Sequence, residues 1–198
     1  MDSKTEKIIF DAALDVFQKK GFAAAKLKEI AEQANINQSL LHYYFRKKEV
    51  LFKSVLKYKI LEILGKITQV LKTTDSLFNN LDEVIKVYHD IFVDNPNMPL
   101  FLISELNNNP TIIRELFEAE EINRFRATIA EHLNKSDLKG HNKVPPEQIL
   151  VSIASMVIFP FLAKEIIKLI FNLDESQSKE FIESRDQLLP ELIKKIIS

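Results

Sequence analysis

The chain contains no cysteine, which excludes a disulfide framework and a metal site built on thiolates. Only three of its 198 residues are glycines, too few for a strand-rich fold with many tight turns. Long hydrophobic runs are also missing, since the longest, residues 149–163, stops at Lys164 before the ~20 residues that a membrane-spanning helix needs. The first ten residues hold no apolar stretch of signal-peptide length. We therefore expect a soluble, cytoplasmic protein.

Neither sign of charge dominates. The net charge is -1, and residues 1–50 carry nine Lys and Arg against seven Asp and Glu. The average charge therefore does not indicate a nucleic-acid partner. Apolar residues make up 46% of the chain, enough to fill a sizeable core. Leu, Ile, Lys and Glu are abundant, and these residues are typical of long helices.

The apolar residues recur at helical spacing along the chain, which predicts an all-α fold of about nine helices. The expected helices cover approximately residues 4–20, 27–33, 37–45, 49–71, 81–95, 99–107, 110–134, 146–173 and 176–197. Gly21 ends the first, Asn35 suits a turn that needs positive φ, and Asn37 is a good N-cap for the third. Pro160 lies inside the eighth, where it should kink or widen the helix.

The first three expected helices form a helix-turn-helix with a support helix, and the third helix has two different faces. At 100° per residue its inner face holds Leu40, Leu41, Tyr44 and Phe45. Its outer face offers an amide, a hydroxyl, an imidazole and a phenol: Gln38, Ser39, His42 and Tyr43. Such groups suit base edges and phosphates, and nearby lysines could neutralise backbone charge: Lys26, Lys28, Lys47 and Lys48. A solvated helix with two surface aromatics is the alternative.

The segment GFAAAKLKEIAEQANINQSLLHYYFRKKEVLF resembles the DNA-binding signature of the tetracycline-repressor (TetR) family, over about residues 5–55. The resemblance lies in the glycine-aromatic pair, the packing pair of the second helix, the end of the recognition helix and the lysine-led start of the fourth: Gly21-Phe22, Ile30-Ala31, Leu41 to Phe45, and Lys48 to Leu51.

Four positions depart from the family pattern. Ala25 and Lys26 stand where threonine is usual, which removes a helix cap worth ~1 kcal/mol. Asn35 replaces the turn glycine, and His42 replaces a frequent tyrosine, so a contact there could depend on pH. These departures leave the fold intact and make the operator preference harder to predict.

The resemblance implies a division into a DNA-binding domain, residues 1–50, and a ligand-sensing and dimerisation domain, residues 51–198. It also implies which side chains meet DNA. The candidates for base contacts are Lys28, Gln38, Ser39 and His42, and those for phosphate contacts are Lys26, Tyr43, Tyr44 and Lys48. Tyr44 could instead pack against the first helix, and Lys48 could be a solvated helix start.

The last two expected helices carry more apolar surface than a monomer of this size buries readily. In the TetR family these helices pair with those of a second subunit, so a homodimer is expected. Two recognition helices must meet major grooves about one turn, ~34 Å, or a multiple of it apart, which suits a palindromic operator. We expect a repressor, because repression is the usual mode of the family.

A set of aromatic and polar residues lies between these two regions, and the resemblance suggests that some line a pocket for an apolar effector. The candidates are Tyr88, His89, Phe92, Phe101, Glu105, Phe117, Met156 and Phe159. Taken one at a time, each is better explained as an ordinary core residue. An effector would act by favouring one of two dimer geometries, so that the recognition helices no longer fit adjacent grooves.

Two other classes of function stay open. The sequence has no motif of a catalytic or cofactor site, its four histidines are dispersed, and no metal or other cofactor is expected, so an enzyme is the weaker alternative. A protein-interaction bundle whose helix-turn-helix no longer binds DNA is the other.

Overall fold

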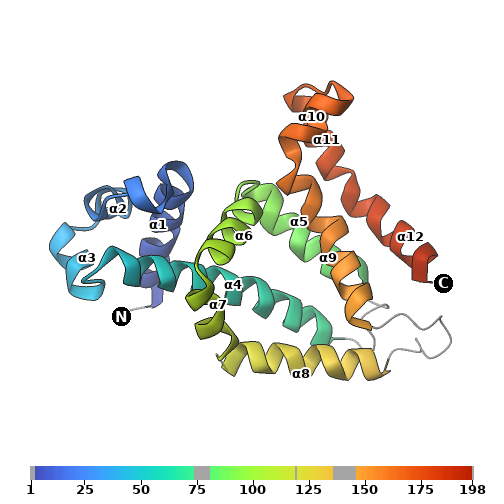
Figure 1. The fold of residues 1–198 in the computed structure, drawn as a ribbon, viewed down its shortest axis with the longest axis horizontal. Coiled ribbons are helices and arrows are strands. Elements are labelled where there is room, and N and C mark those ends of the chain that lie inside the picture. Colours follow the sequence, from blue (N-terminus) through green and yellow to red (C-terminus); the bar gives the residue numbers. More distant parts are fainter. Residues whose placement is uncertain (1–2, 74–80, 119, 136–145, 198) are drawn as a thin grey trace.

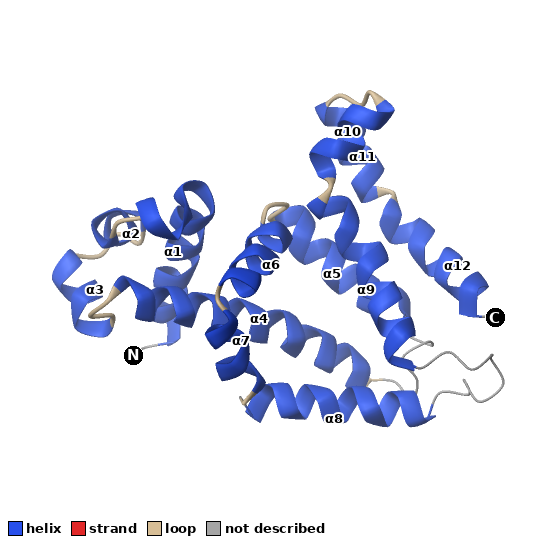
Figure 2. Cartoon of the chain, in the orientation of Figure 1, coloured by secondary structure: helices blue, strands red, loops and turns tan. Residues whose placement is uncertain are grey.

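A computed structural model describes residues 3–73, 81–118, 120–135 and 146–197 of the chain. Within these residues every regular element is a helix (Figures 1 and 2). The helices are α1 (Ser3–Ala24), α2 (Leu27–Gln33), α3 (Gln38–Tyr44), α4 (Lys48–Lys72), α5 (Leu81–Asp94), α6 (Met98–Asn108), α7 (Pro110–Phe117), α8 (Glu120–Lys135), α9 (Pro146–Leu162), α10 (Lys164–Phe171), α11 (Glu175–Glu183) and α12 (Arg185–Ile197). The predicted all-α fold is confirmed. No helix of the described segments combines the length and the apolar character needed to cross a membrane.

The first three helices surround a small apolar core at one end of the molecule (Figure 1). Ile9, Phe17, Ile30 and Leu41 are fully buried there, and each belongs to the apolar stripe of its own helix. The Phe17 ring meets Phe52 of α4 edge-on, with 4.9 Å between the ring centres. Aromatic packing therefore holds the three helices against the start of α4.

Helix α4 connects this end of the molecule to the rest (Figure 1). It packs against α1 near its start and against α5 and α8 further along. Its buried face repeats at helical spacing and includes Leu51, Val55, Ile63 and Leu71. The predicted boundary between residues 50 and 51 falls in the first turn of α4, and the division into two domains there stays a prediction.

The structure has twelve helices in its described residues, where the sequence predicted about nine. Three expected helices are each divided in two: α7 and α8 replace one, α9 and α10 the second, and α11 and α12 the third. Ala163 separates α9 from α10 with φ -103 and ψ 17, outside the α-helical region. The apolar period continues across these breaks, which is why the pattern alone did not reveal them.

Pro160 has a consequence beyond its own helix. It has no N–H, so the carbonyl oxygen of Met156, four residues earlier, loses its usual partner in α9. Nη2 of Arg185 in α12 donates to that oxygen at 3.1 Å. The helix continues through Pro160 to Leu162. A kink at Pro160 itself stays a prediction, and the freed carbonyl joins α9 to α12.

Candidate DNA-binding surface and effector region

The turn between α2 and α3 has the geometry of a helix-turn-helix. Asn35 adopts φ 53, as the sequence predicted for this turn. The backbone N–H of Ile36 donates to the Ala31 carbonyl at 3.0 Å and closes the turn. The Asn37 side chain accepts a hydrogen bond from Leu40 N at 2.6 Å, which confirms it as the N-cap of α3.

Helix α3 divides into the two faces that its sequence predicts. Leu41 and Phe45 are buried, and Leu40 and Tyr44 are half-buried against the domain core. The outer face consists of exposed residues: Gln38, Ser39, His42 and Tyr43. Tyr43 is 77% exposed. These polar and aromatic groups point away from the core, so α3 presents a surface on which base edges could be read.

Two lysines flank this face and keep their charges at the surface. Lys26 is exposed at the N-cap position of α2, where its side chain makes no cap. Lys28 lies 3.8 Å from Glu32, one turn along the same helix, with both side chains mainly in solvent. Such a pair contributes little and is easily exchanged for another anion.

Lys48 has a different role from the one that we expected. Its ammonium donates to the carbonyl oxygens of Phe22, Ala23 and Ala25 at 2.7, 3.1 and 2.9 Å, and lies 4.6 Å from the centre of the Phe22 ring. An ammonium has three N–H groups, and all three are occupied here. Lys48 therefore holds the end of α1 against the start of α4, and in this arrangement it has no N–H left for a phosphate.

Tyr44 lies between the two roles considered for it. Its ring is half-buried against the core and meets Tyr43 edge-on at 5.2 Å. The packing alternative thus accounts for much of its ring, and a phosphate contact by its hydroxyl stays a prediction.

Comparison with known proteins supports the helix-turn-helix described above. The family model described as bacterial regulatory proteins, tetR family, matches residues 9–55, which span α2, α3 and most of α1. The regulator RutR of Escherichia coli K12, an HTH-type transcriptional regulator, is 32% identical over 115 residues. That alignment covers 58% of this chain and 54% of RutR, so the chain matches about half the length of this relative.

Solved structures extend the likeness to the whole fold. A putative transcriptional regulator of Streptomyces coelicolor, SCO4942, superposes with a TM-score of 0.65 at 24% identity and covers 97% of both chains. FadR of Bacillus subtilis, solved with stearoyl-CoA, superposes with a TM-score of 0.59 at 17% identity, over 92% of this chain and 96% of FadR. Residues 9–55 thus match the DNA-binding segment of the tetR family, and the fold of the whole chain is similar to that of these solved regulators.

The helices beyond residue 55 contain the residues proposed for an effector. Phe92 is buried between Tyr88 and Phe161, at centre distances of 5.9 and 5.4 Å. Met156 and Tyr88 both pack on a second buried cluster, formed by Ile85, Ile153, Val157, Leu189 and Ile193. The structure thus brings Tyr88, Phe92 and Met156 together where α5, α9 and α12 meet.

The other candidates lie elsewhere. Phe101 meets Phe52 of α4 at 6.2 Å, next to the DNA-binding end. Glu105 is half-buried, burial raises the pKa of its carboxyl, and it accepts a hydrogen bond from Asn109 at 3.2 Å. Phe159 is 60% exposed on α9, so placing it in an interior pocket was wrong: its position in the helix turns it outward. The side chain of Phe117 lies outside what the structure describes.

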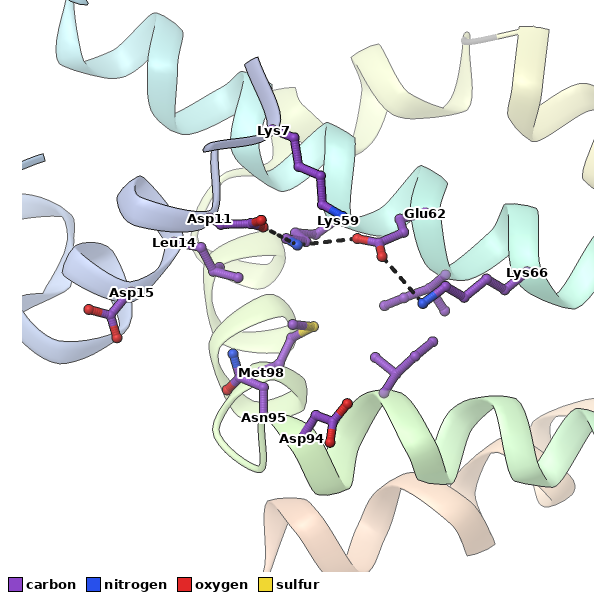
Figure 3. Close-up of a pocket in the computed structure, with 12 residues that line it drawn as sticks. Lys7, Asp11, Leu14, Asp15, Lys59, Glu62, Lys66, Asp94, Asn95 and Met98 are labelled. Atoms are coloured by element: carbon purple, nitrogen blue, oxygen red, sulfur yellow. Dashed lines mark hydrogen bonds and ion pairs between the residues drawn. The ribbon is translucent and has the colours of Figure 1, made fainter. Parts of the chain in front are cut away.

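Sequence reasoning missed a charged cleft of about 430 Å³ between α1, α4 and α5 (Figure 3). Lys59, a buried residue of α4, lies at its centre and binds Asp11 of α1 at 2.7 Å and Glu62 at 3.2 Å. Lys66 approaches Glu62 from the other side at 3.3 Å. A lysine on the otherwise apolar face of α4 was the only signal in the sequence.

The electrostatics of this cleft favour the charged forms of its residues. Burial alone would lower the pKa of the Lys59 ammonium, but the hydrogen bond to Asp11 and the charge of Glu62 outweigh burial and the pKa is raised. Burial likewise opposes ionisation of Glu62, yet the charge of Lys59 leaves the pKa of this carboxyl lowered. The cleft is therefore an ion-pair network that joins the DNA-binding end to α4.

Proposed function

We propose that this chain is a dimeric, DNA-binding transcriptional regulator, a repressor that a small-molecule effector releases from a palindromic operator. The observation that carries the proposal is the outer face of α3, whose four polar residues are exposed on a closed helix-turn-helix. A protein-interaction bundle would have no need of this constellation beside a turn that matches the TetR-family signature. The match of residues 9–55 to the tetR family model favours the regulator over both alternatives.

The dimer is supported by apolar surface at the opposite end of the molecule. Eight large apolar residues are exposed on α9, α10 and α12: Val151, Phe159, Ile166, Leu169, Ile170, Phe171, Leu188 and Leu192. Exposed apolar surface gathered on neighbouring helices is typical of an interface. A second copy bound there would present a second α3, which the reading of two major grooves requires.

An effector would act through α4 and the ion-pair network that joins it to α1. A small molecule bound among α5, α9 and α12 can shift the dimer only if it prefers one of two geometries. The likeness to FadR concerns the fold, so the identity of its ligand is not transferred to this chain.

Selection of bound sites from random duplex DNA by the full-length chain tests the proposal. We expect enriched sites to form a palindrome, with half-sites one helical turn or a multiple apart. The variant Gln38→Ala should change the preferred base at one position of each half-site. The variant Tyr43→Phe should instead weaken binding to all sequences alike. No enrichment over random sequence would contradict the regulator and favour the interaction bundle.

Two lysines offer a matched pair of variants. Lys28 and Lys179 are 72% and 71% exposed, and each faces a glutamate four residues later, at 3.8 and 3.6 Å. Lys28→Met should weaken binding to the selected operator and reduce the dependence of log Kd on log salt by about one. Lys179→Met, on α11, removes the same charge far from α3 and should change neither. Equal effects of both variants would mean that only net charge matters.

A further inference from the structure

Arg185, the first residue of α12, carries a positive charge that no carboxylate of the described residues neutralises. One of its nitrogens, Nη2, is held by the Met156 carbonyl, and the guanidinium lies 5.9 Å from the centre of the Phe181 ring. Its Nε is closed to solvent and makes no hydrogen bond. Burial lowers the pKa of this guanidinium. Arg185 is half-buried, and a buried N–H group without an acceptor is costly, so its surroundings suit an anion that the described residues do not supply.

Helix α5, which packs against α12, holds a second buried nitrogen without a partner. Helices α5 and α12 run in opposite directions and pack together (Figure 1). Ile85 of α5 shares a buried cluster with Leu189 and Ile193 of α12. His89 lies one turn further along α5 than Ile85, and Arg185 lies one turn earlier along α12 than Leu189. The antiparallel course therefore brings His89 and Arg185 to about the same level.

Two polar side chains of α5, Tyr88 and His89, lie near this level. The Nε2 atom of His89 is closed to solvent and has no hydrogen-bond partner. Its Nδ1 is 3.9 Å from Asp90, too far for a hydrogen bond. Beside it, burial raises the pKa of Tyr88 to about 12, so the phenol keeps its proton at neutral pH. The Nε atom of Arg185 and the Nε2 atom of His89 are therefore two buried nitrogens without a partner, and N–H groups at both positions would be complementary to an oxyanion.

The side chains packed in this part of α5 and α9 are apolar and aromatic. Phe92 and Phe161 pack edge to face beside Tyr88, and Met156 joins the cluster of Ile153 and Val157. We propose that Arg185 and His89 bind the oxyanion of an effector whose remaining part is apolar and lies among these side chains. This inference rests on the proposed function, since it names the chemistry of the effector. Arg185 was not among the candidates that the sequence suggested.

The test compares three ligands with the same ten-carbon chain, decanoate, decyl phosphate and 1-decanol, by calorimetry and thermal shift on the full chain without DNA. We expect at least one anion to bind about tenfold more tightly than the alcohol, since a charge-assisted hydrogen bond is about twice as strong as a neutral one. Whether the carboxylate or the phosphate binds more tightly identifies the oxyanion. Equal binding of all three, or none, overturns the inference.

Variants separate recognition from a structural role. Arg185→Met should abolish the preference for the anion while leaving the affinity for 1-decanol within about twofold. Arg185→Lys should retain part of the preference. Arg124→Met, which removes an exposed arginine of α8 with a 3.9 Å contact to Glu120, is the matched control. If Arg185→Met lowers the melting temperature but still prefers the anion to 1-decanol, the role of Arg185 is only to bind the Met156 carbonyl, and the inference fails.

Because Arg185→Met could also unfold the chain, His89→Leu gives an independent test. It removes the second donor and should reduce the preference for the anion severalfold, whereas His89→Gln, which keeps an N–H, should retain it. The assay contains no DNA. Failure to bind any operator would thus overturn the proposed function and leave this site standing, whereas loss of anion preference with intact operator binding would do the opposite.

Discussion

The Lys59 network allows a prediction whose size follows from the structure. Lys59→Met keeps a side chain of similar length in its buried position and removes the charge that Asp11 and Glu62 share. Removing one partner of a fully buried ion pair costs ~3–5 kcal/mol, because the other charge stays buried alone. Here Asp11 is 47% exposed and Glu62 32% exposed, so water can rehydrate both carboxylates. We therefore expect a loss of ~1–2 kcal/mol in the free energy of unfolding.

The pH dependence of that loss follows from the two shifted groups. The pKa of Glu62 is lowered from 4.5, so its contribution is present above pH 4.5 and disappears as the pH falls through the folded value. The pKa of Lys59 is raised from 10.5, so its contribution is present below pH 10.5 and disappears as the pH rises through the folded value. The difference between the wild type and Lys59→Met should thus be largest between these limits and should shrink in acid.

Urea unfolding at fixed protein concentration measures this difference, and a double-mutant cycle with Asp11→Asn isolates the bond between α1 and α4. Lys66→Met is the control, because Lys66 is exposed and its ion pair in the described residues is with Glu62, and we expect a loss below ~0.5 kcal/mol. Equal losses for Lys59→Met and Lys66→Met, or additive effects of Lys59→Met and Asp11→Asn, would refute the reasoning.

Three further variants test other parts of the structure. Asn37→Ala removes the cap from Leu40 N and should destabilise the DNA-binding end by ~1 kcal/mol, measured by thermal unfolding; an unchanged melting temperature would contradict the cap. Lys48→Met removes three hydrogen bonds to carbonyls and should lower the free energy of unfolding by ~2 kcal/mol even without DNA. If the variant has wild-type stability but binds DNA more weakly, Lys48 contacts a phosphate instead. Leu169→Glu charges a residue that is 83% exposed on α10 and should shift sedimentation towards the monomer without loss of helical circular dichroism; an unchanged dimer would place the interface elsewhere.

The sequence by itself determined the features that depend on near neighbours in the chain. The helical period, the positive φ of Asn35 and the cap by Asn37 act within one or two turns of backbone, so they were predicted and are present. The same holds for the two faces of α3, because a helix of known start and period leaves no choice about which residues share a side. The sequence of residues 38–43 therefore determines the exposed outer face of α3.

Only the tertiary structure decided the contacts between residues distant in the chain. Lys48 meets carbonyls 23 to 26 residues away, Lys59 meets Asp11 at a separation of 48, and Arg185 meets Met156 at a separation of 29. None of these pairs leaves a periodic trace, because each depends on which helix packs beside which and in what direction. The exposure of Phe159 also depends on the tertiary structure, because an apolar residue gives the same sequence pattern in a core and at an interface.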